Sequence, residues 1–348
     1  MHIYFLLFAA CLWTQALTAH IRDTVTHITH DTARDHALWK SARTLCPKTW
    51  NLNIVQAGYY RWKKKHPYQA ELDRVRNELI THHHAQASMV TTADAKQLSV
   101  LTFIRPKARA TLLFVTGYFD YLTPTKEWCG PLIEIFKEYN IVIFDWRHVG
   151  QSAVMNKQTS RKLSADIAQD VVAMLTFCRT HSSLTKLPLI AHSFCLGGAL
   201  TLHALTHFLR KTPQYMPDGI ALSCTPANIP AVQDTMRYAS PDWSYQAFFA
   251  LPWLRSYFFK KSIPASIRAL DPKKMLAQLS LPCAVDYTIE DGMVPLQNTL
   301  VAEEGAHMDR ITHSLISEHG RHVRIHKYAT AQYHDAYDAF YKSVSIKT

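Results

Sequence analysis

Short runs of consecutive apolar residues, each bounded by turn residues, recur along the chain. They lie at 111–115, 141–144, 188–191, 219–222 and 283–285. A segment with the apolar spacing of a helix, 131–139, separates the first two runs. Continuous apolar runs are typical of strands buried on both faces, and their alternation with helices is typical of parallel sheets. An antiparallel pair, 87–90 and 98–104, precedes them. The pattern predicts an α/β fold with a doubly wound, mostly parallel sheet and a ligand site at the carboxyl ends of its strands.

Two segments break this alternation. Helical spacing dominates from about residue 31 to 87, which predicts a helical N-terminal extension over 20–85. Residues 225–279 combine six prolines with many aromatic residues, which indicates a helical cap inserted over the strand ends. The chain therefore divides into a signal peptide (1–19), the extension (20–85), an α/β core in two parts (86–224 and 280–348) and the cap (225–279).

The first residues predict export. The apolar run 3–17 ends in small residues at 16–19, as a signal peptide does, and it is too short to span a membrane comfortably. The segment before Cys11 loosely resembles a lipobox, so lipoprotein anchoring through Cys11 is the less favoured alternative.

Composition and charge narrow the classes of partner. With 348 residues, 48% of them hydrophobic, the chain can bury a large core, which excludes a disordered protein. The net charge of +11 favours an anionic membrane surface as a partner, whereas no zinc-finger spacing or basic recognition helix supports nucleic acid. No CxxC pair occurs, and we expect neither a metal nor a cofactor. The sequence makes no prediction of oligomeric state.

Glycine is scarce, with 10 in 348 residues, and half of these glycines fall in the turns after predicted strands. Glycine permits tight turns and close backbone approach, so these turns are candidate functional positions. They are Gly117, Gly150, Gly197, Gly198 and Gly292.

Five strand-end signatures follow one another in a fixed order. They are FVTGY (114–118), DWRHVGQS (145–152), AHSFCLGG (191–198), EDGMVP (290–295) and QYHD (332–335). The order of nucleophile, acid and histidine resembles the α/β-hydrolase superfamily, and within it the monoacylglycerol lipase, lysophospholipase and serine aminopeptidase group. The resemblance covers roughly residues 86–348. The second signature is similar to the group's DxRGxGxS motif with His148 for the first glycine, and the first is similar to its HG turn with Thr116 for histidine.

The turn that would carry the nucleophile has two readings. In the first, Ser193 is the nucleophile, flanked by the small residues Ala191 and Cys195. The resemblance then implies that the backbone N–H groups of Phe194 and Tyr118 stabilise the oxyanion. The residue preference of the resembled family and the opening of the motif favour Ser193, which we prefer.

In the second reading Cys195 is the nucleophile, as in the cysteine-containing turn of dienelactone hydrolases, with Leu196 as the oxyanion donor. The second residue after the nucleophile is then Gly197, which fits the close approach of such a turn better than cysteine does. This reading would also place His192 inside a buried central strand, where its ring needs a partner.

The remaining triad members come from the last two signatures. Asp291 is preferred over Glu290 as the acid because the Asp-x-x-Val-Pro spacing matches the resembled family, and Asp286 is an outside candidate. His334 is preferred as the histidine because it closes the chain order before a predicted terminal helix, 336–344. Asp145 and Arg147 are expected to hold strand-end loops together.

Together these features predict an exported serine hydrolase that cleaves carboxylic esters through an acyl-enzyme. The resemblance, the aromatic cap and the basic surface point to single-chain lipid esters, such as a lysophospholipid or a monoacylglycerol. A peptidase or an acyltransferase would use the same triad. The alternative from another class is a binding protein that kept the fold without the chemistry, because Thr116 and the altered turn depart from the family.

Overall fold

The computed structural model describes residues 66–117, 129–156, 167–235, 265–289, 291, 294–302, 305–317, 322–323, 325–328 and 330–345. The predicted signal peptide, Cys11 and most of the predicted N-terminal extension lie outside the described residues, as does the middle of the predicted cap.

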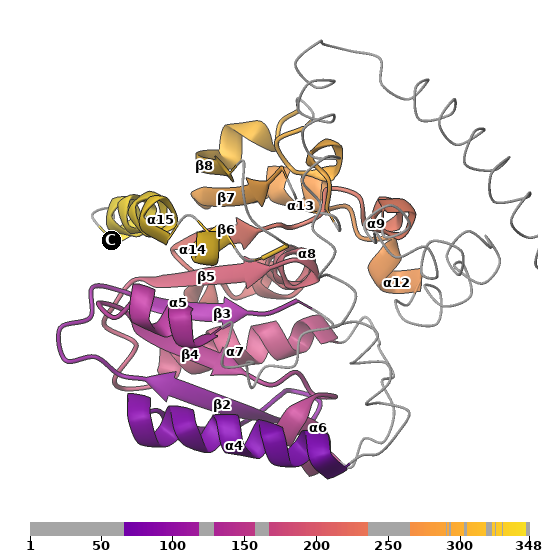
Figure 1. The fold of residues 1–348 in the computed structure, drawn as a ribbon. Coiled ribbons are helices and arrows are strands. Elements are labelled where there is room, and N and C mark those ends of the chain that lie inside the picture. The colour runs from indigo at the N-terminus through magenta and orange to yellow at the C-terminus, as the bar shows by residue number, and fades with distance from the viewer. Residues whose placement is uncertain are drawn as a thin grey trace, which may run out of the picture.

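An eight-stranded sheet organises the described part of the chain (Figure 1). The strands are β1 (Gln86–Thr91), β2 (Gln97–Phe103), β3 (Thr111–Val115), β4 (Asn140–Phe144), β5 (Leu189–Phe194), β6 (Gly219–Ser223), β7 (Cys283–Thr288) and β8 (Ile311–Ser317). Their order is β1-β2-β4-β3-β5-β6-β7-β8. The β1–β2 and β2–β4 pairs are antiparallel, and every pair from β4 to β8 is parallel. The expectation of a mostly parallel α/β sheet is confirmed.

The sequence did not predict β8, and its position explains why. Strands β3, β4 and β6 are buried at every residue, so they read as continuous apolar runs. β8 lies at the edge of the sheet, and along it partly buried and exposed residues alternate. Its polar and histidine positions interrupt the apolar run that the other strands show.

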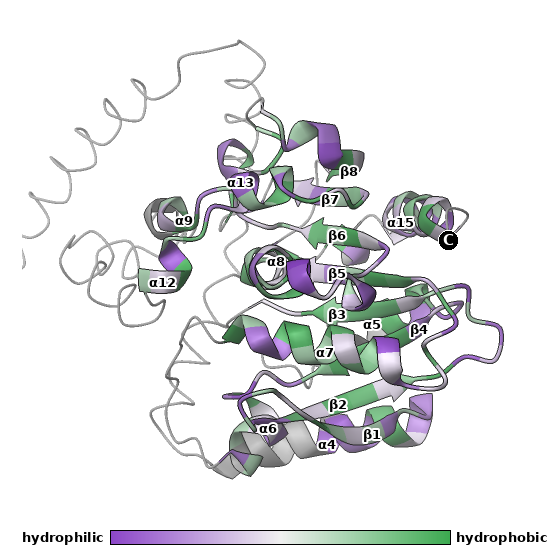
Figure 2. Ribbon diagram, turned by 180° about the vertical axis from the view of Figure 1, so that it is seen from behind, coloured by the Kyte–Doolittle hydropathy of each residue, from purple (hydrophilic) through white to green (hydrophobic). Residues whose placement is uncertain are grey.

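Helices cover both faces of the sheet. They are α4 (His66–His83), α5 (Cys129–Ile135), α6 (Gly150–Met155), α7 (Ala168–Thr180), α8 (Leu196–His203), α9 (Ile229–Thr235), α12 (Ala265–Arg268), α13 (Pro272–Ala277), α14 (Ile325–Tyr328) and α15 (Thr330–Ser345). A π-helical turn, Ala204–Phe208, continues α8. Figures 1 and 2 show α7 and α8 on one face of the sheet and α5 and α15 on the other.

Two neighbouring residues of β5 show the two faces directly. The hydroxyl of Ser193 bonds to Thr201 of α8, whereas the ring of His192 contacts Tyr341 of α15. Hydrophobic residues are concentrated on the central strands of the sheet (Figure 2). None of the helices in the described residues is long and apolar enough to cross a membrane.

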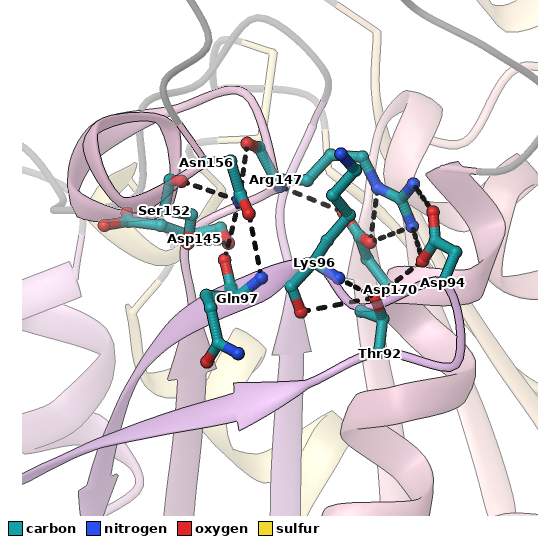
Figure 3. Close-up of polar contacts among 9 residues, drawn as sticks. All are labelled: Thr92, Asp94, Lys96, Gln97, Asp145, Arg147, Ser152, Asn156 and Asp170. Carbon is teal, nitrogen blue, oxygen red and sulfur yellow. Dashed lines mark hydrogen bonds and ion pairs between the residues drawn. The ribbon is translucent and has the colours of Figure 1, made fainter.

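The loop after β4 is held by buried polar contacts, as expected for Asp145 and Arg147 (Figure 3). The Arg147 guanidinium donates to Asp170 on α7 and to Asp94 in the β1–β2 turn, at 2.7 Å and 2.6 Å. The Asp145 carboxylate accepts the backbone N–H of Gln151 at 3.0 Å. Gly150 adopts a φ of +50°, and a Cβ there would lie 2.5 Å from that carboxylate, so this turn requires glycine.

Candidate active site

The turn between β5 and α8 is centred on Cys195. This residue links β5 to α8 and has a φ of 52° and a ψ of −128°, which are unfavourable for a side chain with a Cβ. Its backbone N–H donates to the carbonyl of Ser223 on the neighbouring strand at 2.8 Å, which fixes the turn against the sheet. A strained strand-to-helix turn that raises one side chain above the sheet is the geometry of a nucleophile in an α/β-hydrolase.

Close approach of the backbone explains the glycine that follows Cys195. A Cβ at Gly197 would lie 2.7 Å from the carbonyl oxygen of Val115 and closer still to that of Thr116, at the end of β3. Backbone atoms cannot move aside as a flexible side chain can. The glycine two residues after Cys195 therefore allows α8 to begin directly against β3, as the second sequence reading expects.

The structure does not place Ser193 or Phe194 where the preferred reading expected them. Ser193 lies within β5, is fully buried, and its hydroxyl hydrogen-bonds Thr201 at 2.8 Å. Phe194 is the last residue of the same strand and pairs with Ser223 in the sheet. Strand geometry directs the Ser193 side chain under α8 rather than into the turn, so the arrangement favours the second reading over the preferred one.

The buried His192 has the partners that the second reading required. Its Nε2 lies 2.9 Å from the hydroxyl of Ser223, and its Nδ1 lies 2.7 Å from that of Tyr341. Burial, with a smaller effect of His326, lowers the pKa of His192 to about 3, so the ring is neutral. The objection to Cys195 from an unpartnered histidine is thereby removed.

Asp291 forms a buried pair with a histidine, but with His322 rather than His334. The Oδ2 atom of Asp291 lies 2.7 Å from Nδ1 of His322, and its Oδ1 atom accepts the backbone N–H of Val294 at 2.9 Å. Both side chains are buried. This contact assigns the Asp291 carboxylate the position expected of the acid.

His334, the histidine that the sequence favoured, lies elsewhere in the fold. It is part of α15, its side chain is 37% exposed, and its Nδ1 lies 3.1 Å from the carboxylate of the adjacent Asp335. The terminal helix begins at Thr330 instead of 336. His322 was missed because β8 was missed. Functional residues of this fold follow the strands. With β8 predicted to end near residue 317, His322 would have been the candidate histidine.

Four chemically active side chains now share one edge of the sheet. Cys195 follows β5, Cys224 follows β6, Asp291 follows β7 and His322 follows β8. These four strands are adjacent and parallel, so their carboxyl ends meet at the same edge. This is the edge at which the strand pattern predicts a ligand site.

The charge of His322 depends on its neighbours. Burial by itself would lower its pKa, but the Asp291 carboxylate and the Cys195 sulfur, acting as charge and hydrogen-bond partners, raise it well above the usual range. The buried Nε2 atom has no hydrogen bond of ordinary geometry among the described residues. Cys195 is therefore a neighbour of the His322 ring that acts on its charge, without a well-formed hydrogen bond to Nε2.

Backbone strain is concentrated around these residues. Among the described residues, five other than glycine have a positive φ, and three of them, Cys195, Cys224 and Val323, belong to this site. Val323 directly follows His322, and its backbone N–H donates to the sulfur of Cys224 at 3.5 Å. A β-branched residue rarely adopts such a φ, and strain of this kind is typical of functional sites.

Tyr118 and Asp286 are the remaining site residues that the sequence suggested. Tyr118, the expected oxyanion donor after the glycine turn, lies outside the described residues. Asp286, the outside candidate for the acid, is buried and accepts a hydrogen bond from Tyr337 at 2.9 Å. Burial and the nearby Asp291 raise its pKa to about 7, although hydrogen bonds from Ser223 and Tyr337 oppose this shift.

Comparison with known proteins shows the fold. No family model matches the sequence, and a search of curated proteins found no match. An esterase of Pyrococcus furiosus is similar over 77% of this chain and 92% of its own, with 15% identity and a TM-score of 0.59. An acylaminoacyl peptidase of Pyrococcus horikoshii matches over 74% of this chain and 41% of its own, with 14% identity and a TM-score of 0.52.

A proline iminopeptidase of Mycobacterium smegmatis is similar over 75% of this chain and 99% of its own, with 12% identity and a TM-score of 0.50. These enzymes share the α/β-hydrolase fold with this chain. They act on different bonds, so the likeness does not choose among substrates.

Proposed function

We propose that this protein is a cysteine-dependent acyl hydrolase whose triad is Cys195, His322 and Asp291. The observation that carries the proposal is the position of Cys195 at the strained turn after β5, beside a histidine that is paired with a buried carboxylate. A thiol needs a neighbouring imidazole to become a strong nucleophile, and the imidazole needs a carboxylate to fix its tautomer.

The residues divide the reaction into two steps. In the first, Nε2 of His322 takes the Cys195 thiol proton, and the sulfur attacks the ester carbonyl. His322 then gives that proton to the leaving alkoxide, and a thioester remains on Cys195. In the second step, Nε2 takes a proton from water, the resulting hydroxide attacks the thioester, and the thiol is restored when the acid leaves. Asp291 accepts the Nδ1–H bond throughout and stabilises the imidazolium.

The oxyanion donors follow from the same turn. Leu196 is the first residue of α8, where a backbone N–H has no partner within the helix. We assign this N–H as one donor and that of Tyr118 as the second, in place of the pair with Phe194. A single donor of this kind is worth about 3–4 kcal/mol of transition-state stabilisation.

The substrate and the location rest on the sequence. An aromatic cap segment, a net charge of +11 and the apolar N-terminal run support single-chain lipid esters, an anionic membrane surface and export. The peptidases among the similar structures make an aminoacyl amide the second candidate substrate.

The test is steady-state hydrolysis of a monoacylglycerol, a lysophospholipid, a short p-nitrophenyl ester and an aminoacyl amide by the full-length protein. Cys195→Ala and His322→Ala should each abolish hydrolysis of every accepted substrate. Ser193→Ala is the matched control, since it removes a buried hydroxyl from the same strand and should retain most activity. Loss of activity in Ser193→Ala, with full activity in Cys195→Ala, would contradict the proposal.

A further inference from the structure

Beside the triad lies a second cysteine that the proposed reaction does not use. Cys224 follows β6, is fully buried, and interacts with both His322 and Asp291. One ligand atom from each of Cys224, Asp291 and His322 lies within 4.8 Å of the others. We infer that these three side chains form a binding site for a divalent transition-metal ion of the Zn²⁺ class.

The set of ligands suits such an ion. Zn²⁺ binds sulfur, imidazole nitrogen and carboxylate oxygen at about 2.3, 2.0 and 2.1 Å in tetrahedral geometry. Thiolate and imidazole together select Zn²⁺ and its neighbours over Mg²⁺ or Ca²⁺, which prefer oxygen. Three protein ligands leave the fourth position for water.

The position of the ion follows from the Asp291–His322 contact. Nδ1 is the ring nitrogen that faces the carboxylate, so an ion shared by the two must bind Nδ1. The present separation of 2.7 Å would widen to roughly 3.3 Å around a tetrahedral ion. The backbone N–H of Val323, which points at Cys224, remains available to the thiolate.

Proton balance is simple. The Cys224 thiol loses its proton to solvent as the sulfur binds the ion. Nδ1 of His322 must also be free of its proton, and the ring then carries one proton, on Nε2. Binding of the ion therefore releases protons, and affinity should rise with pH.

The bound ion and the hydrogen-bonded arrangement of the triad cannot be present at the same time. With the ion on Nδ1, His322 no longer donates to Asp291, and its protonated Nε2 cannot accept the Cys195 proton. This consequence, inhibition by the metal, rests on the proposed function. The binding site itself does not.

The experiment is a titration of the full-length, reduced protein with Co²⁺, followed by absorption. Thiolate-to-cobalt charge transfer in the near ultraviolet reports a sulfur ligand directly, and Zn²⁺ should displace the band. Wild type and Cys195→Ser should each bind one equivalent with this band. Cys224→Ser should lose the band and bind Co²⁺ at least tenfold more weakly. Cys283→Ser is the matched control, because Cys283 is equally buried at the opposite end of β7 and should keep the band.

A band that is absent from wild type, survives in Cys224→Ser or disappears in Cys195→Ser would overturn the site. If Cys224→Ser does not fold, the spectra of wild type and Cys195→Ser still test the metal site. Lack of the band in either protein contradicts the proposal. Esterase assays with Zn²⁺ then test inhibition separately. If the protein shows the cobalt band but no esterase activity, the metal site is supported and the proposed function is contradicted.

Discussion

The carboxylate of Asp291 and the imidazole of His322 are hydrogen-bonded at 2.7 Å although 31 residues separate them in the chain. Each follows one of two neighbouring parallel strands, β7 and β8, and each is buried. Their contact orients the ring, and it makes His322 the candidate partner of Cys195 among the histidines of the described residues.

Asp291→Asn should keep the shape of this contact and remove its charge. The amide cannot stabilise the imidazolium, and it can hold the ring in the wrong tautomer. We expect kcat/KM for ester hydrolysis to fall by a factor on the order of 10²–10⁴, in line with the same change in serine proteases. Asp309→Asn, which alters an exposed carboxylate, is the control and should retain wild-type kinetics. Equal activity of the two variants would contradict the assigned acid.

Gly197→Ala should destabilise the fold as well as the site. The new Cβ would meet the carbonyl groups of Val115 and Thr116, and only a backbone shift can relieve that overlap. Overpacking of this kind costs about 1–3 kcal/mol, measurable as a lower urea midpoint. Ser182 is exposed and already carries a Cβ, so Ser182→Ala serves as the control and should shift the midpoint far less. A Gly197→Ala midpoint equal to wild type would show that α8 does not rest on β3 as described.

The buried Asp286 should make stability depend on pH. Its pKa is raised from 3.8 to about 7 in the folded protein, so over that range the native state holds a proton that the unfolded chain has released. The free energy of unfolding therefore falls as pH rises, by at most about 1.4 kcal/mol per pH unit for this group. Asp286→Asn removes the effect, so it should gain stability relative to wild type between about pH 5 and pH 7. A stability difference that is constant with pH would refute this assignment.

The two carboxylates on Arg147 should differ in their contribution to stability. Asp170 is fully buried, whereas the side chain of Asp94 is 35% exposed. Removing one partner of a buried pair typically costs about 3–5 kcal/mol, and removing a partly exposed one about 1 kcal/mol or less. Urea unfolding of Asp170→Ala and Asp94→Ala should therefore show a much larger loss for Asp170. Similar losses of stability in the two variants would mean that the Arg147–Asp170 pair is as solvated as the Arg147–Asp94 pair.

The strands that could be predicted from the sequence are those buried on both faces of the sheet. Strands such as β3 and β4, covered on both faces, appear as apolar runs and were predicted close to their observed bounds. The edge strand β8 alternates in exposure and was missed. That single omission moved the predicted histidine to His334, because no strand end pointed to His322.

The choice between Ser193 and Cys195 needed three-dimensional information. The sequence showed the glycine pair two residues late for Ser193, which is the feature that favours Cys195. It could not show that the backbone turns at Cys195 or that His192 has hydroxyl partners on β6 and α15. Cys224 gave no signal, since a buried thiol after an apolar run is ordinary.

The most direct test of the account is to trap the covalent intermediate. The full-length protein is mixed with an activated ester, quenched in acid within the first turnover, and the acylated peptide is sequenced by mass spectrometry. We predict a hydroxylamine-sensitive thioester on Cys195, absent from Cys195→Ala and still formed in Ser193→Ala. An acyl group on Ser193, or ester turnover with no acylated residue, would contradict the assignment of Cys195 as the nucleophile.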